Sequence, residues 1–170
     1  MLTTSNIILL IAATTTALMA GLFYSYSCSV NPGLGRLPDA EYIHAMQSIN
    51  RSIQNPLFFV SFFGALVFLP LSAYLHYRES LSTRFWLLLI AAIVYLIGAF
   101  GVTVIGNIPL NETLDKFNLV SASQEAITAQ RAKFEGRWNN LNSIRTIAST
   151  LAIILVIIAC LCHHKSNPYS

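Results

Sequence analysis

The stretch FWLLLIAAIVYLIGAFGVTVIG, residues Phe85–Gly106, decides the fold of this chain. It contains 22 residues and no charged side chain. About 20 apolar residues in an α-helix are enough to cross the roughly 30 Å hydrocarbon core of a bilayer. Three further runs have the same apolar character: Ile7–Cys28, Leu57–Leu75 and Ile147–Cys162. The sequence therefore predicts four transmembrane helices.

The composition agrees with membrane insertion. The chain is 55% hydrophobic and 10% charged, whereas soluble domains carry about 25% charged residues. The first run is longer than the apolar core of a signal peptide and has no Lys or Arg before it, so we expect it to be a retained span. The fold class is thus all-α: an antiparallel bundle of four transmembrane helices, forming one domain over residues 1–170.

The two long connections, residues 31–55 and 107–145, hold most of the polar residues. An even number of spans places both connections on one side of the membrane. In the first, an amphipathic cap helix is expected over Ala40–Gln54, with Asp39 as its N-cap. In the third, Ser121 followed by Gln124 fits a capping box, which predicts a second cap helix running to about Phe134, with Gly136 interrupting it before the last span.

The distribution of Lys and Arg bears on orientation. The side with the termini is short and carries Arg78, Arg84 and Lys165 against one acid, Glu79. The side with the long connections carries more basic residues in total, but at lower density and beside six acids. Basic residues in short loops favour the cytoplasmic side. By density we expect a multi-pass protein of a bacterial inner (plasma) membrane with both termini cytoplasmic; the raw count favours the reverse.

Several function classes are disfavoured. The net charge of +3 is small and scattered, so no nucleic-acid partner is expected. There is no phosphate-binding glycine loop, nucleophile elbow or haem-attachment motif. The spans hold no chain of acids, which argues against a proton-driven transporter. The tail residues Cys160, Cys162, His163 and His164 superficially suggest a metal site, but they are simpler to interpret as the end of the last span at the membrane surface.

Three polar groups mark a candidate site on the side with the long connections. They are His44, Gln47, Asn50 and Arg51; Asn107, Asn111 and Asp115; and Trp138, Asn142, Arg145 and Thr146. Helical spacing places His44, Gln47 and Arg51 on one face, and Trp138, Asn142 and Arg145 on one stripe. A cation just inside a span needs a polar partner, and for Arg145 the candidates are Asp115, Glu112 or a ligand oxygen. Alternatively, these residues only fasten the cap to the bundle.

The same blocks resemble a known family. The segments NPGLGRLPDAEYIHAMQSINR (31–51), GNIPLNETLD (106–115) and WNNLNSIRT (138–146) are similar to the signature blocks of DUF1772, or anthrone oxygenase-like, membrane proteins. The resemblance implies a four-helix membrane protein that oxygenates an anthrone- or quinol-like aromatic substrate without a cofactor. Such a reaction needs a base, donors for an oxyanion and an apolar slot for flat rings.

Residues at the matched positions can supply these roles. His44 is the expected base, and Arg51 and Arg145 are the expected catalytic cations. The expected substrate-binding residues are Gln47, Asn107, Asn111, Trp138 and Asn142. Neither a metal nor a cofactor is expected, and the oligomeric state stays open. The alternative is a non-enzymatic membrane bundle that binds a lipid or a partner membrane protein; it predicts the same residues bonded to one another, with no cavity between them.

Overall fold

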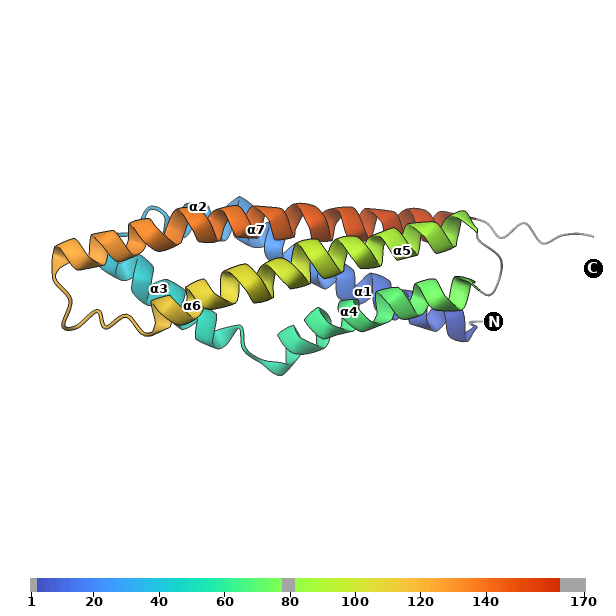
Figure 1. Cartoon of the computed structure of the whole chain (residues 1–170), viewed down its shortest axis with the longest axis horizontal. Helices are drawn as coiled ribbons and strands as arrows, with labels where there is room; N and C mark the ends of the chain where they lie inside the picture. The colour runs from blue at the N-terminus through green and yellow to red at the C-terminus, as the bar shows by residue number, and fades with distance from the viewer. Residues whose placement is uncertain (1–2, 78–81, 163–170) are drawn as a thin grey trace, which may run out of the picture.

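The computed structural model describes residues 3–77 and 82–162, and within them every regular element is a helix. Four helical stretches are long and apolar enough to cross a membrane (Figure 1). The predicted all-α, four-span fold class is therefore confirmed. The elements in chain order are α1 (Thr4–Ser25), η1 (Tyr26–Val30), α2 (Asn31–Leu34), α3 (Asp39–Ser52), α4 (Pro56–Tyr77), α5 (Thr83–Tyr95), η2 (Leu96–Gly101), η3 (Thr103–Asn107), α6 (Ile108–Asp115) and α7 (Gln124–Leu161).

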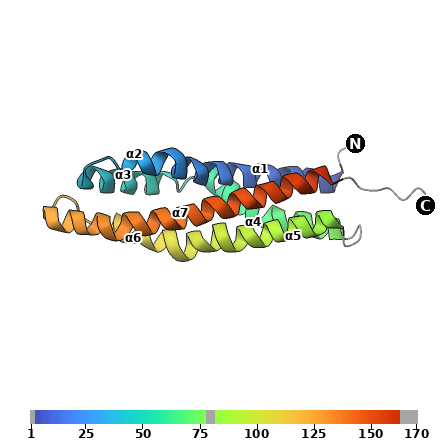
Figure 2. The same cartoon turned by 90° about the horizontal axis from the view of Figure 1, so that it is seen from above.

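The long helices alternate in direction and form a ring. α1 packs against α4 and α7, and α5 packs against the same two helices. Figure 2 shows the bundle from a second side, with both termini at one end and the long connections at the other. Small residues allow the close approaches: a Cβ at Gly98 would lie 2.4 Å from the Cβ of Ala148, and one at Gly64 would lie 2.8 Å from Cγ2 of Thr15.

Two apolar cores divide the molecule along its length. The larger core lies inside the four spans and includes Phe62, Leu88 and Tyr95. The smaller core lies in the cap, where Tyr42 and Met46 of α3 pack with residues of α6 and α7. The cap is thus a packed extension of the bundle.

The last helix differs in detail from the expectation. α7 runs without a break through Gly136, so the cap helix of the third connection is the beginning of the last span. Its N-cap is Ser123, whose hydroxyl accepts from the backbone N–H of Ala126. A glycine inside a helix costs only about 1 kcal/mol. Phe134 and Trp138, on either side of Gly136, are both buried in the cap core, with ring centroids 6.3 Å apart.

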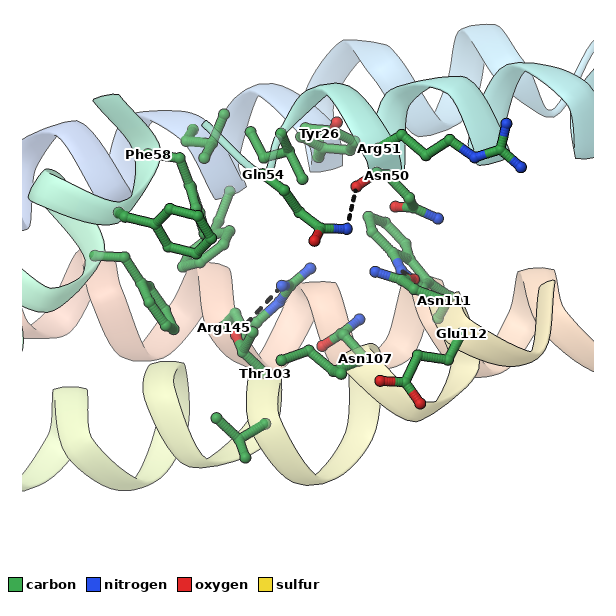
Figure 3. Close-up of a pocket in the computed structure, with 18 of the residues that line it drawn as sticks. Tyr26, Asn50, Arg51, Gln54, Phe58, Thr103, Asn107, Asn111, Glu112 and Arg145 are labelled. Carbon is green, nitrogen blue, oxygen red and sulfur yellow. Dashed lines mark hydrogen bonds between the residues drawn. The ribbon is translucent and has the colours of Figure 1, made fainter. Parts of the chain in front are cut away.

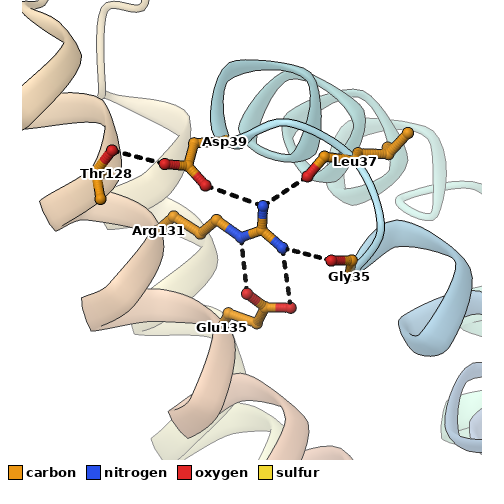
Figure 4. Close-up of polar contacts among 6 residues, drawn as sticks. All are labelled: Gly35, Leu37, Asp39, Thr128, Arg131 and Glu135. Carbon is orange, nitrogen blue, oxygen red and sulfur yellow. Dashed lines mark hydrogen bonds and ion pairs between the residues drawn. The ribbon is translucent and has the colours of Figure 1, made fainter.

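Arg131 fastens the first connection to α7 (Figure 4). Its guanidinium donates to the carbonyl oxygens of Gly35 and Leu37, and forms ion pairs with Asp39 and Glu135. The same group lies 4.5 Å from the centroid of the Tyr42 ring. This cluster fixes where α3 begins, and therefore where the residues of α3 stand over the bundle.

Candidate functional site

A pocket of about 450 Å³ lies where the spans meet the cap. Its walls come from α1, α3, α4, α7 and the helix that runs from η2 to α6 (Figure 3). A volume of this size is typical of small-molecule sites, which are mostly apolar with a few placed polar groups.

The inner part of the pocket is aromatic. Six phenylalanines line the pocket: Phe23, Phe58, Phe59, Phe62, Phe63 and Phe100. Phe62 stacks on Phe58 and on Phe100, with ring centroids 5.1 and 5.2 Å apart. Flat rings packed this way offer a surface for another flat, apolar molecule.

Three buried polar side chains on the pocket wall have atoms without a hydrogen-bond partner among the described residues. They are Nδ2 of Asn50, both Nδ2 and Oδ1 of Asn107, and Nε of Arg145. An unsatisfied buried polar group costs about 1–3 kcal/mol. Asn107 is 1% exposed and Arg145 is 6% exposed, so bulk water reaches them little. Unmet donors from three elements around one pocket indicate a place for an oxygen acceptor.

Arg145 is held in place by neutral groups. It donates to Oδ1 of Asn142 at 2.9 Å and to Oγ1 of Thr103 at 3.3 Å. Its guanidinium carbon lies 4.5 Å from the Phe23 ring centroid and 5.3 Å from that of Trp138. Within the described residues no carboxylate forms an ion pair with Arg145. The expected partners Asp115 and Glu112 line the same pocket but do not pair with it, so its charge remains available to a ligand oxygen.

Widened, π-helical turns shape two of the walls. η2 and η3 interrupt the third span, and η3 ends at Asn107; η1 follows α1 in the first span and begins at Tyr26. Such turns change the phase of the helix and occur often at functional sites. Thr103 is the first residue of η3 and Asn107 is the last. Both line the pocket.

The cap side of the pocket is charged. Nε of Arg51 lies 2.6 Å from Oδ1 of Asp115, and both side chains are largely exposed. Glu112 is the other pocket-lining carboxylate, and it forms no ion pair with another described residue. Asn111 accepts a hydrogen bond from Nε1 of Trp138 at 2.8 Å, which fixes the indole in the wall.

Five of the eight expected site residues line this pocket: Arg51, Asn107, Asn111, Trp138 and Arg145. The other three do not. His44 is exposed to solvent on α3 and is not part of the wall. Gln47 is buried and donates to the carbonyl oxygens of Leu114 and Phe117, so it caps the end of α6. Asn142 stands behind Arg145, and also donates to the Phe23 carbonyl and to Ser27.

Sequence reasoning undervalued three residues of the wall. Asn50 belongs to the first polar group but has no expected role, and Thr103 and Tyr26 lie outside the three polar groups. All three line the pocket, and the ring of Tyr26 lies 5.6 Å from that of Trp138. The spacing of Thr103 from Asn107 is the signal that could have linked Thr103 to the site.

No metal centre emerges from residues 3–77 and 82–162, which contain no group of three or more metal-binding side chains. His163 and His164 of the tail lie outside the described residues.

Comparison with known protein families gives a match. A family model described as anthrone oxygenase matches residues 58–155, which is 98 of the 170 residues. No curated protein and no solved structure matches the chain. The matched segment contains Thr103, Asn107, Trp138 and Arg145, whereas Asn50 and Arg51 precede it.

Proposed function

The chain belongs to the anthrone oxygenase family, and from that premise we propose that it is a membrane-embedded, cofactor-independent oxygenase of an anthrone-like aromatic substrate. One observation carries the proposal. In the part of the chain that the structure describes, the buried guanidinium of Arg145 has no carboxylate partner and the amide of Asn107 has no hydrogen-bond partner, and both line a pocket rich in phenylalanine.

The overall reaction needs only the substrate and molecular oxygen. An anthrone methylene, CH₂, becomes a carbonyl, C=O, while one oxygen atom leaves as water. The ring carbon loses four electrons and O₂ accepts four, so no external reductant is required. Removal of the first methylene proton gives an aromatic oxyanion. That anion reduces O₂, a C–O bond forms, and loss of the second proton breaks the O–O bond.

Arg145 and Asn107 are the proposed binding groups for the oxyanion. Both present N–H donors in a site with little water, where such donors stabilise developing negative charge most strongly. Because the hydrogen-bond partners of Arg145 are neutral, no carboxylate of residues 3–77 and 82–162 cancels its charge. Stabilising the oxyanion also makes the methylene more acidic, which brings the first step within reach of a weak base.

Glu112 is the proposed base. His44, the base expected from the sequence, lies outside the pocket wall. Asp115 is engaged by Arg51. Glu112 is the pocket-lining carboxylate that forms no ion pair with another described residue. A proton acceptor in this position contributes about 10²–10⁴ in rate.

The test is oxygen uptake and quinone formation from an anthrone by purified protein in liposomes. We expect Arg145→Met to lower kcat by about 10²–10³, the usual cost of losing an oxyanion donor. Glu112→Gln should lower kcat by about 10²–10⁴, because the proton acceptor is lost. His44→Ala and Glu41→Gln are the matched controls, since neither residue lines the pocket, and both should keep wild-type rates.

Two results would contradict the proposal. Equal rates for wild type and Arg145→Met would exclude the oxyanion role. A wild-type protein that binds an anthrone but consumes no oxygen would favour the non-enzymatic alternative, a pocket that only binds a lipid or another small apolar molecule.

The density of basic residues supports an orientation as well. We infer that the termini face the cytoplasm and that the cap faces the other side. Reporter fusions to the C-terminus and to the loop between α6 and α7 would show opposite locations if this is right.

A further inference from the structure

The pocket has two boundaries of opposite character. Towards the cap it is bordered by charged side chains of α3, of α6 and of the residue that follows α6, namely Arg51, Glu112, Asp115 and Lys116. Towards the side of the bundle it is bordered by apolar side chains that are between 40% and 47% exposed: Phe59, Phe63, Val104 and Ile108. The first boundary meets water and the second faces the surroundings of the spans.

The apolar boundary lies between α4 and the helix that contains η2 and η3, and these two helices diverge towards the cap. α4 packs along α5 but makes only slight contact with η2 (Figure 1). The floor of the resulting wedge is aromatic, because the Phe100 ring lies 5.2 Å from Phe62 and 6.1 Å from Phe63. Above this floor, Phe59 of α4 and Val104 of η3 both line the pocket and remain partly exposed.

The wedge lies at the depth of lipid chains. α4 has 22 residues, which gives a length of about 33 Å at 1.5 Å per residue. Nearly all of α4 is therefore needed to cross the roughly 30 Å hydrocarbon core. Phe59 and Phe63 lie in the first third of α4, inside the hydrocarbon on the cap side.

We propose that this wedge is a lateral portal through which an apolar aromatic substrate enters the pocket directly from the bilayer. The proposal rests on the proposed function and names the substrate class more closely: molecules dissolved in lipid, with one polar oxygen edge. Burying about 200 Å² of ring surface favours lipid over water by about 5 kcal/mol, which is more than a thousandfold in concentration. The charged cap boundary is the less favourable route, since its groups would lose water as a flat ring passed.

Inside the pocket, the apolar rings of the substrate and its polar oxygen contact different residues. A molecule that enters between Phe59 and Val104 reaches the phenylalanine floor with its apolar body. Its oxygen edge then reaches Asn107 and Arg145, which line the same pocket.

The two tryptophans of the chain allow a test that does not need catalysis. Trp138 lines the pocket and is 4% exposed, whereas Trp86 is 49% exposed near the start of α5. In a Trp86→Phe protein reconstituted in liposomes of brominated phosphatidylcholine, acyl chains that occupy the portal should quench Trp138. Iodide in the water should quench it little. A Trp138→Phe protein, which retains Trp86 on the surface of a span, checks that the brominated chains quench an exposed indole.

Blocking the portal completes the experiment. In the Trp86→Phe protein, Val104→Phe should remove most of the lipid quenching of Trp138. Val60→Phe is the matched control, because Val60 is 70% exposed on α4 and does not line the pocket; it should leave the quenching unchanged. For the active enzyme, Val104→Phe should raise the KM for an anthrone supplied in liposomes with little change in kcat.

The outcomes separate the two proposals. Quenching of Trp138 by iodide but not by brominated lipid, or equal quenching in the Val104→Phe and Val60→Phe proteins, overturns the portal even if the protein is an active oxygenase. Lipid quenching that Val104→Phe abolishes supports the portal even if no anthrone is oxidised, in which case only the proposed reaction falls.

Discussion

Arg145 and Asn107 carry the argument at the scale of single residues. A buried charge is costly unless it is paired or satisfied by hydrogen bonds. Arg145 donates to two neutral acceptors and lies against two aromatic rings, yet no described residue accepts a hydrogen bond from its Nε. Asn107, on the adjoining helix η3, has an amide with no partner among the described residues. Neither arrangement is the most stable one, and both gain a partner when an oxygen atom enters the pocket.

Replacing Asn107 separates stability from function. Leucine fills a similar volume to asparagine, and Asn107→Leu removes an unsatisfied amide. We therefore expect this variant to unfold in detergent at the wild-type thermal midpoint or above it, with a gain of up to about 1 kcal/mol in the free energy of unfolding. Anthrone oxidation should fall by roughly tenfold or more because an oxyanion donor is lost. Asn142→Leu is the comparison: its amide is fully bonded, so the thermal midpoint should drop. A destabilised Asn107→Leu protein would mean that Asn107 has a structural role.

At the scale of elements, α7 joins the two halves of the molecule. Its 38 residues give about 57 Å, almost twice the hydrocarbon thickness. One end therefore crosses the membrane beside α1 and α5, and the other end packs against α3 and α6 in the cap. Arg145 and Trp138 lie near the middle of α7, so the pocket is formed where the helix passes from one environment to the other.

Two glycines distinguish packing from helix continuity. Gly98→Ala should lower the free energy of unfolding by about 1–3 kcal/mol, the cost of overpacking, since its new Cβ would meet Ala148 at 2.4 Å. Gly136→Ala should raise it by up to about 1 kcal/mol, because nothing lies within 4 Å of the added atom and α7 is continuous there. Chemical unfolding monitored by circular dichroism measures both. A destabilised Gly136→Ala protein would contradict an unbroken α7.

At the scale of the whole molecule, the cap is fixed to the bundle by a polar cluster that water reaches. The hydroxyl of Thr128 donates to Asp39 at 2.6 Å, and Arg131 pairs with the same carboxylate. The Thr128 hydrogen bond, followed by the Arg131 guanidinium, holds the pKa of Asp39 below its usual range. Because the pKa is lowered on folding, this contribution is present above the unfolded pKa of about 4 and is lost as the pH falls through the folded value.

The cluster predicts a pH-dependent cap. Asp39→Asn should lower the thermal midpoint at pH 7, and the difference from wild type should shrink as the pH is lowered below about 4. Glu41→Gln, in the same first turn of α3 but without Arg131 as a partner, is the control. A difference between wild type and Asp39→Asn that stays constant from neutral to acidic pH would mean that the charge of Asp39 is not what holds the cap.

The sequence predicts the fold well because a bilayer leaves few alternatives: long apolar runs must be helices that satisfy their own backbone. It also predicts part of the site, because placing the charge of Arg145 or the amide of Asn107 inside a span costs free energy unless a partner is present. The expected position of His44 in the site differs from the structure. The helical period groups His44 with Gln47 and Arg51, but it does not show which of these side chains faces the bundle. The structure buries Tyr42, Met46, Gln47 and Asn50, and Gln47 is drawn in by the free carbonyls at the end of α6.

The π-helical turns of the third span have a consequence for how related chains should be aligned. A turn closed by i→i+5 bonds holds one more residue than an ordinary turn closed by i→i+4. In a regular transmembrane helix, deleting one codon rotates everything beyond it by about 100°. Between Leu96 and Gly101 a deletion can instead convert the wide turn to an ordinary one, leaving Thr103 and Asn107 facing the pocket. A relative shorter by one residue here is therefore expected to keep the site, and an alignment drawn without a gap would pair its polar residues with the wrong neighbours.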